Sequence, residues 1–376
     1  MTYDQIKERY YSFLDSMVDC DVSLFDGISA DCLMLHSLYE ETHDETARRL
    51  LMQMMEIINK YHGESLDMTF GRGVLGIMYM FSTIDEATID ASIIEKQLGN
   101  YIDNCRRVKN YDLQYGLIGV GLLCVGEAKK ANRKCAELLG SIIKSLMVLF
   151  ERMSNDIELV HYYLERHYML PDKEKWCNMG LLHGFPSIIA FFLICIKEGY
   201  GNIPMVNHVN SFMRLMADIL VKTDYLVPTS LWYHESSLKS GFAGYGLTYC
   251  TGCLGLISTL AMAYETIGDE DCYSHARNCL MRNIENLDNE QDMGINCFCH
   301  GNAGMMYLLS KLSKSLNVHI NDKALSFMKE KILMEYTSSD RYRTGLLNGM
   351  TGLTLSLLWG SSDNGNKTME RVLLLN

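Results

Sequence analysis

The chain has 376 residues, 48% of them hydrophobic, and a formal net charge of -12. This charge argues against nucleic-acid binding and mildly favours a basic or neutral partner. Thirteen cysteines, an odd number without framework spacing, indicate reduced core thiols plus metal ligands rather than disulfides. No Pro/Ser-rich linker or composition break divides the chain, so a single domain over residues 1–376 is predicted.

Two features argue against a membrane or secreted protein. The longest uninterrupted apolar stretch, around residues 191–196, is too short to span a bilayer. Residues 1–5 lack the basic and apolar regions of a signal peptide. We therefore expect a cytoplasmic protein without a transmembrane segment.

A short motif recurs seven times: a glycine, a small residue three positions later, and usually an apolar helical run. The repeated glycines are Gly27, Gly73, Gly116, Gly184, Gly252, Gly301 and Gly349. The second small positions are Ala30, Gly76, Gly119, Ser187, Gly255, Gly304 and Gly352. The copies lie 43 to 68 residues apart, which is enough for one helical hairpin each. The first copy is the most degenerate, because Asp31 follows Ala30.

Two kinds of predicted helix alternate along the chain. The runs after the glycines, such as 77–81, 188–193 and 353–358, are apolar on all sides. The intervening stretches are amphipathic, with charges on one face, and lie at 45–60, 134–150, 207–221, 271–287 and 320–336. With only four prolines, this alternation predicts an all-α fold, an α/α toroid of seven helical-hairpin repeats with an inner ring inside an outer ring.

The toroid gives the glycines a physical role. The ends of inner helices crowd together, and only small residues permit close backbone approach there. All seven loops then open on the same face of the barrel. Residues that are distant in sequence but equivalent in the repeat therefore converge, which an open solenoid of similar period would not achieve.

Two of these loops contain metal-ligand side chains. Tyr249-Cys250-Thr251-Gly252 and Cys299-His300-Gly301 lie about fifty residues apart and together offer two thiolates and an imidazole. This ligand set suits zinc, and three protein ligands leave the fourth tetrahedral position open for a substrate.

Two other interpretations of these residues stay open. Cys250 and Cys299 can be buried apolar thiols, with His300 a loop residue. A closed site of four cysteines is also conceivable, because Cys253 and Cys297 lie three and two residues from the candidate ligands.

Together with two further segments, these loops resemble the lanthionine synthetase C family, most closely its stand-alone class I lanthipeptide cyclases. The family's Asp-bearing segment is similar to residues 111–119, which include Asp112. Its Gly-x-x-His-Gly segment is similar to residues 180–184, which include His183. All four motifs occur in the family's order, and the resemblance covers essentially the full length.

The resemblance implies a zinc-dependent reaction. Zinc would be held by Cys250, Cys299 and His300, and a peptide cysteine thiol would add to dehydroalanine or dehydrobutyrine to form a thioether ring. Zinc suits this step because coordination deprotonates a thiol near neutral pH. The substrate would be a dehydrated precursor peptide, with a dehydratase and an exporter as further partners.

His183 and Asp112 are the candidate catalytic residues outside the metal group. His183 directly precedes its glycine, as His300 does, and its imidazole can exchange protons near pH 7. Asp112 would orient or charge that imidazole, although an Asp near a helix start is also an ordinary cap.

Two departures from the family pattern concern the mechanism. The positions of its usual Arg and Tyr around the first zinc cysteine are Gly246 and Thr251 here. A missing Arg would remove a partner of the enolate oxygen. Arg72, which directly precedes Gly73, is the candidate replacement, or else a surface arginine at a helix start.

Two alternative functions follow from the same residues. One is a zinc-thiolate transferase that adds glutathione to dehydrated peptides, and the other is a non-catalytic scaffold of a peptide-modifying complex. The stretch from Leu159 to Trp176 is predicted to be a long loop or hairpin that clamps the peptide or is only solvated.

Overall fold

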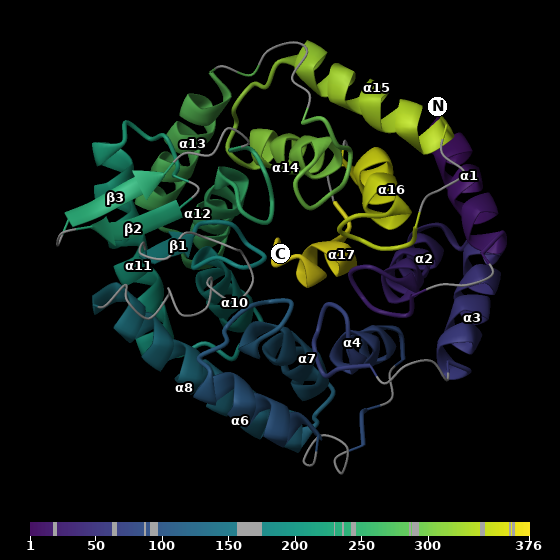
Figure 1. Cartoon of the computed structure of the whole chain (residues 1–376), viewed down its shortest axis with the longest axis horizontal. Coiled ribbons are helices and arrows are strands. Elements are labelled where there is room, and N and C mark those ends of the chain that lie inside the picture. The colour runs from purple at the N-terminus through teal and green to yellow at the C-terminus, as the bar shows by residue number, and fades with distance from the viewer. Residues whose placement is uncertain are drawn as a thin grey trace.

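The computed structural model describes residues 1–17, 21–61, 66–85, 88–90, 97–155, 175–228, 230–234, 237–241, 246–285, 287, 293–338, 343–360, 362 and 365–376. Two concentric rings of helices run around a common axis (Figure 1). None of the helices in these ranges has the length and apolar character that crossing a bilayer requires. The predicted all-α toroid is confirmed.

The inner ring holds the helices that follow the repeated glycines. They are α2 (Ile28–Thr42), α4 (Val74–Ile84), α7 (Leu117–Lys129), α10 (Pro186–Lys197), α12 (Cys253–Ile267), α14 (Asn302–Ser315) and α16 (Met350–Trp359). They are apolar on all sides because they pack against both the outer ring and the helices beside them. In α10, for example, every residue from Pro186 to Cys195 is buried.

The outer ring holds the amphipathic helices. They are α1 (Tyr3–Asp15), α3 (Glu45–Asn59), α6 (Gly99–Arg107), α8 (Arg133–Asn155), α11 (Ile203–Lys222), α13 (Glu270–Ile284) and α15 (Asp322–Ser338). The ring closes where α1 packs on α16 and α16 packs on α2. Residues near both ends of the sequence therefore share one part of the core.

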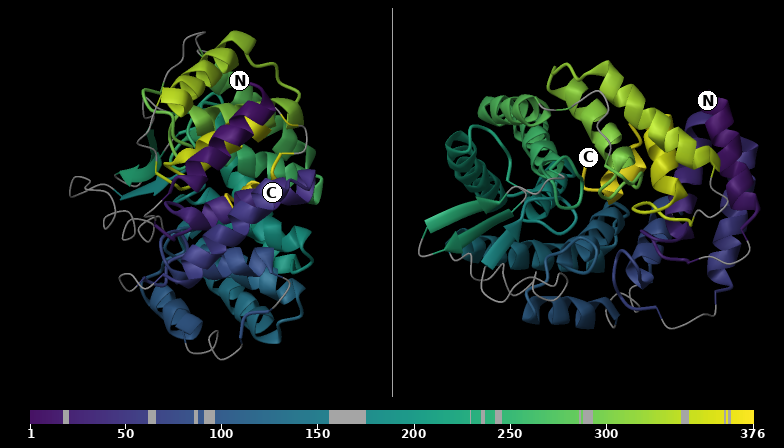
Figure 2. Two further views of the ribbon diagram at one scale, coloured as in Figure 1. Left: turned by 90° about the vertical axis from the view of Figure 1, so that its right-hand side faces the viewer. Right: turned by 45° about the horizontal axis from the view of Figure 1, so that its top comes forward.

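Two elements lie outside this alternation. A small antiparallel sheet of β1 (Lys175–Asn178), β2 (Ser230–His234) and β3 (Ser237–Gly241) projects from the ring beside α11 and α12 (Figure 2). Its register pairs Lys175 with Tyr233 and Ser230 with Gly241. The last helix, α17 (Lys367–Val372), lies inside the inner ring (Figure 1). Helical periodicity predicts neither the sheet nor the place of α17.

A closed belt of backbone hydrogen bonds joins the seven loops that precede the inner helices. In each case an amide of one loop donates to a carbonyl of the next. The bonds run from Phe25 to Gly71 (2.8 Å), Gly71 to Gln114 (3.0 Å), Leu113 to Leu182 (3.3 Å), Leu181 to Tyr249 (3.1 Å), Cys250 to Cys299 (3.2 Å), Cys299 to Leu347 (3.0 Å) and Leu346 to Phe25 (2.8 Å). The belt satisfies the polar backbone of crowded loops and confirms that all seven meet on one face.

The second small residue of the repeat lets adjacent loops approach one another. A Cβ added at Gly352 would lie 2.1 Å from the Leu346 carbonyl oxygen and 2.9 Å from the Phe298 side chain of the neighbouring loop. A Cβ at Gly76 would lie 2.6 Å from the Leu24 side chain. These distances are shorter than real Cβ contacts, so the predicted need for small residues at these positions is confirmed.

Three layers follow from the position of each loop residue relative to its glycine. Residues three before the glycine are fully buried: Leu24, Phe70, Leu113, Leu181, Tyr249, Phe298 and Leu346. Residues two before it belong to the belt. Residues directly before it are half-buried or exposed and face the mouth of the toroid: Asp26, Arg72, Tyr115, His183, Thr251, His300 and Asn348.

Candidate metal centre

The candidate ligands lie on two neighbouring loops of the belt. Cys250 is two residues before Gly252, which caps α12, and His300 is directly before Gly301, which caps α14. The hydrogen bond from the Cys250 amide to the Cys299 carbonyl holds the two loops together at 3.2 Å. Gly180 allows a third loop to pack on them, because a Cβ there would lie 2.1 Å from the Cys250 carbonyl oxygen.

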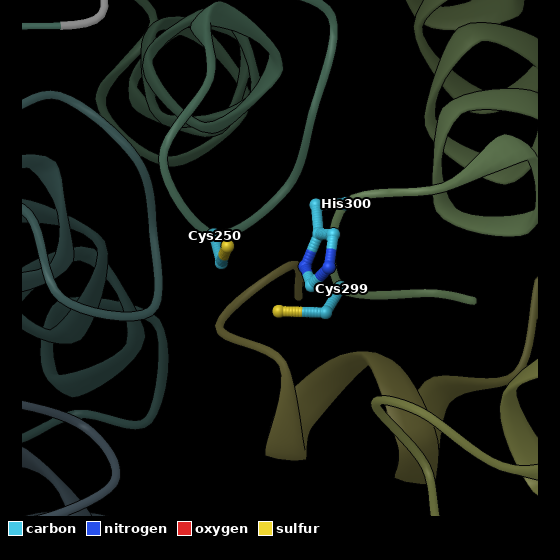
Figure 3. A group of neighbouring side chains, drawn as sticks. All are labelled: Cys250, Cys299 and His300. Atoms are coloured by element: carbon cyan, nitrogen blue, oxygen red, sulfur yellow. The ribbon is translucent and has the colours of Figure 1, made fainter. Parts of the chain in front are cut away.

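The three candidate ligands converge. The Sγ atoms of Cys250 and Cys299 and a ring nitrogen of His300 all lie within 4.8 Å of one another. The three side chains point toward one another from their two loops (Figure 3). The two cysteines are 5% and 6% exposed, whereas His300 is exposed at the mouth. The arrangement therefore has a buried thiol side and an open side that a substrate can reach.

The charge state of this group fits a cation. A hydrogen bond with Cys299 lowers the pKa of Cys250 well below its usual range, helped by His300 and His183 against the effect of burial. The same hydrogen bond and burial raise the pKa of Cys299. Hydrogen bonds to Cys250 and Cys297 raise the pKa of His300 to about 10. Cys250 is thus the more acidic of the two thiols, and a bound metal ion would favour the thiolate form of both.

The donor set fits a zinc site with one open position better than a closed structural site of four cysteines. Two sulfurs and one imidazole nitrogen are ligands that zinc accepts, and three ligands leave a position open. Within the described residues, Cys253 and Cys297 do not belong to the converging group. Cys253 instead begins α12 and is buried.

His183 and Asp112 lie together at the same mouth. His183 Nδ1 is 2.5 Å from Asp112 Oδ2, and both side chains are largely buried. Burial alone would lower the pKa of His183, but the Asp112 carboxylate, with a contribution from Cys250, raises it. His183 is thus close enough to Cys250 to interact with it electrostatically.

Asp112 has two structural roles at once. Its Oδ1 accepts hydrogen bonds from the backbone amides of Gln114 (2.6 Å) and Tyr115 (2.9 Å). Its other oxygen is left for His183. Asp112 therefore stabilises the turn before α7 and contacts His183, whereas the cap position of α7 itself is Gly116, without a side-chain cap.

Two further mouth residues surround His183. The Tyr115 ring stacks on the His183 ring with 6.3 Å between centroids and 5° between planes. Arg72 Nε lies 2.6 Å from Asp26 Oδ2, and its side chain is 58% exposed. The Arg72 guanidinium also influences the pKa of Tyr115, opposing the increase caused by burial. A cation therefore lies at the mouth, paired and accessible.

A cavity of about 300 Å³ lies beside the metal group. Its lining includes His300, Cys297, Asn348, Leu353 and the exposed Ile295. This cavity provides open space next to His300.

The repeat pattern identifies most of the residues at the mouth of the toroid. One predicted feature, the long loop from Leu159, can be placed only in part. Tyr115 and Asp26 stand at the same repeat position as His183 and His300, so the sequence contains a signal for them that the motif comparison misses. The predicted loop from Leu159 lies outside the described residues as far as residue 174. Its last two residues begin β1.

Comparison with known proteins identifies the family of the chain. Residues 18–373 match the family of lanthionine synthetase C-like proteins. No curated protein sequence matches the chain.

Among solved structures, nisin cyclase is similar with a TM-score of 0.64 and 18% identity, over 99% of this chain and 96% of that one. An alpha-1,6-mannanase from Salegentibacter sp. HEL1_6 reaches a TM-score of 0.41 at 12% identity, over 95% of this chain and 98% of that one. The family match spans nearly the whole toroid, metal group included, and the chain belongs to the lanthionine synthetase C-like family.

Proposed function

We propose that the protein is a zinc-dependent cyclase that forms thioether rings in a dehydrated precursor peptide. The observation that carries this proposal is the convergence of Cys250, Cys299 and His300 at the mouth of the toroid, beside the His183–Asp112 pair. Family membership and the nisin cyclase fold support it. A dehydratase would have to act first, since the reaction consumes dehydro residues, and an exporter would act on the product.

Cys250, Cys299 and His300 would hold the zinc ion. When bound, zinc supplies the Lewis acidity that deprotonates a peptide thiol near neutral pH. The two buried thiols would hold the ion from the core side, and the open side near the cavity would admit the peptide.

His183 would supply the proton that completes the addition. The substrate sulfur bonds to the β-carbon, the double-bond electrons move to the enolate, and the α-carbon then takes a proton. Asp112 holds His183 at Nδ1, so Nε2 is the nitrogen available for this transfer. The Asp112 carboxylate raises the pKa of His183, which favours the protonated ring that this transfer requires.

A thiol-protection assay tests the proposal. A peptide with one dehydroalanine and one cysteine is incubated with the protein. Free thiols are then alkylated, and the peptide mass is measured by mass spectrometry. Ring formation leaves the mass unchanged and removes the alkylatable thiol, and Cys299→Ala should not catalyse it. With glutathione present, an adduct in place of a ring would favour the transferase, and a thiol that stays reactive would favour the scaffold.

Metal analysis of purified variants tests the ligand set separately. Cys250→Ala, Cys299→Ala and His300→Ala should lose the single zinc ion, because each removes one of three ligands. Cys253→Ala and Cys297→Ala should retain it and serve as matched controls. A Cys253→Ala protein without zinc would instead favour a closed site of four cysteines.

A further inference from the structure

Tyr249 differs from the residues at its equivalent positions in the other loops. The fully buried layer three residues before each repeated glycine consists of leucine and phenylalanine except at Tyr249. A buried hydroxyl costs free energy unless it forms a hydrogen bond. The fold must therefore supply a partner for this one phenol.

The partner comes from the end of the described chain. The Tyr249 hydroxyl donates to the Leu373 carbonyl oxygen at 3.0 Å, and both residues are fully buried. Leu373 directly follows α17, the helix inside the inner ring (Figure 1). The bond thus joins the loop of a candidate metal ligand to a segment more than a hundred residues away.

Residues 373–376 are themselves held in place from several sides. Lys311 Nζ donates to the Leu375 carbonyl at 3.0 Å, and Lys197 Nζ donates to Asn376 Oδ1 at 2.6 Å. Leu374 has a φ of 57°, a backbone conformation that a leucine keeps only where surrounding contacts fix it. The segment is therefore a defined support and not a loose tail.

Tyr249 transmits this support to both candidate thiol ligands. It directly precedes Cys250, and its carbonyl accepts the belt bond from Leu181. Its ring packs edge-on against Phe298, the residue before Cys299, with centroids 5.8 Å apart. A shift of the Tyr249 ring would consequently move both sulfurs.

We propose that Tyr249 is a positioning residue of the metal centre, which fixes Cys250 and Cys299 by anchoring their loops to the Leu373 carbonyl. This inference rests on the proposed zinc site. Because the anchor and the metal act on the same loop, zinc binding and the order of residues 373–376 are coupled.

Tyr307 offers a matched control. It is also a buried tyrosine whose hydroxyl bonds to the same region, donating to Glu370 Oε1 of α17 at 2.9 Å. It lies within α14, and its ring also packs on Phe298, with centroids 5.7 Å apart, but no candidate ligand is next to it in sequence. Tyr249→Phe and Tyr307→Phe each remove one hydroxyl and keep the ring.

The experiment compares zinc affinity in the full chain by competition with a chromophoric chelator, alongside the thermal midpoint. Tyr249→Phe should weaken zinc binding by about 10- to 100-fold, as loss of a group that orients a metal ligand does. Tyr307→Phe should keep the wild-type affinity for zinc, even if it lowers the thermal midpoint as much as Tyr249→Phe does. Hydrogen exchange at residues 373–376 should slow on zinc addition in the wild type and not in Tyr249→Phe.

Three results would overturn the inference. Wild-type zinc affinity in Tyr249→Phe would show that the anchor does not position the ligands. Equal loss in Tyr307→Phe would show only general destabilisation. A wild-type protein that binds no zinc would refute the proposed metal centre and this role with it, so the two failures are distinguishable.

Discussion

At the scale of single residues, the position directly before each repeated glycine decides which side chains meet at the mouth. It places Asp26, Arg72, Tyr115 and His183 on the first four loops of one belt and His300 on the sixth. Each of these loops ends in a helix N-terminus, so none of the side chains needs a long excursion to reach the others. Roles can therefore be tested residue by residue against a fixed backbone.

His183→Ala should retain zinc and fold but lose about two to four orders of magnitude in ring formation, as expected for a general acid. Asp112→Asn should lose less. Asp112 raises the pKa of His183, so Asp112→Asn should lower it and move the alkaline limb of the kcat/KM profile to lower pH. Equal activity of wild type and His183→Ala would remove the histidine from the mechanism.

Arg72 is the accessible cation that the structure places at the mouth. If it stabilises the enolate oxygen, Arg72→Ala should slow ring formation about a hundredfold without changing zinc content. Gly246→Arg in that background should recover part of the rate.

Arg48→Ala is a suitable control for Arg72→Ala. Its side chain is also 58% exposed and pairs with one carboxylate, but it lies on outer helix α3. A contrary result is that Arg72→Ala forms rings at the normal rate while the single variant Gly246→Arg forms them faster than wild type. That result would show that Arg72 does not replace the missing arginine and that the protein is a weakened cyclase.

At the scale of elements, the first and last repeats meet at a buried carboxyl group. Asp31 Oδ1, on α2, accepts hydrogen bonds from Tyr10 of α1 and Thr351 of α16, both at 2.5 Å. Its Oδ2 is buried without a partner. The residue that makes the first repeat degenerate thus joins the three helices that close the ring.

Asp31 should make stability fall as pH rises. Burial raises its pKa from 3.8 to about 7, against the hydrogen bonds of Thr351 and Tyr10. The folded state therefore keeps a proton that the unfolded state has lost, and stability decreases between these two values. The free energy of unfolding of Asp31→Asn is measured with urea across this pH range. The change with pH should be smaller than in wild type by on the order of 4 kcal/mol, and the variant should be more stable than wild type at alkaline pH.

Asp44→Asn is a control in which the pH dependence of stability should change in the opposite direction. Although burial opposes it, pairing with Lys7 and the Thr46 amide lowers the pKa of Asp44. The stabilisation by Asp44 is present above the pKa of its unfolded state and is lost as pH falls.

If Asp31→Asn shows the same dependence of stability on pH as wild type, the Asp31 carboxyl does not hold the proton in the folded state.

The sequence predicts the elements that follow a period and misses those that depend on tertiary contacts. Inner and outer helices alternate as hydrophobicity indicates, and repeat equivalence brings Cys250, Cys299 and His300 together. The place of α17 inside the ring is not predictable in this way, because its short sequence has no repeat counterpart. The Tyr249–Leu373 bond depends on that placement.

At the scale of the whole molecule, the geometry of the candidate metal centre depends on ring closure. Cys250 and Cys299 come from the fifth and sixth loops, and their belt continues through Leu347 and Phe25 back to the first loop. The hydrophobic core is likewise continuous from Ile6 to Leu375. The proposed single domain over residues 1–376 should accordingly unfold in one cooperative transition.

The most direct test of the account is whether ring formation follows the metal in one preparation. The wild-type protein is assayed on a dehydrated cysteine peptide before chelation, after chelation and after zinc is returned, with Cys299→Ala in parallel. We predict that thiol loss in the peptide stops on chelation and resumes with zinc in the wild type only. Undiminished ring formation by metal-free protein, or equal ring formation by Cys299→Ala, would contradict the account.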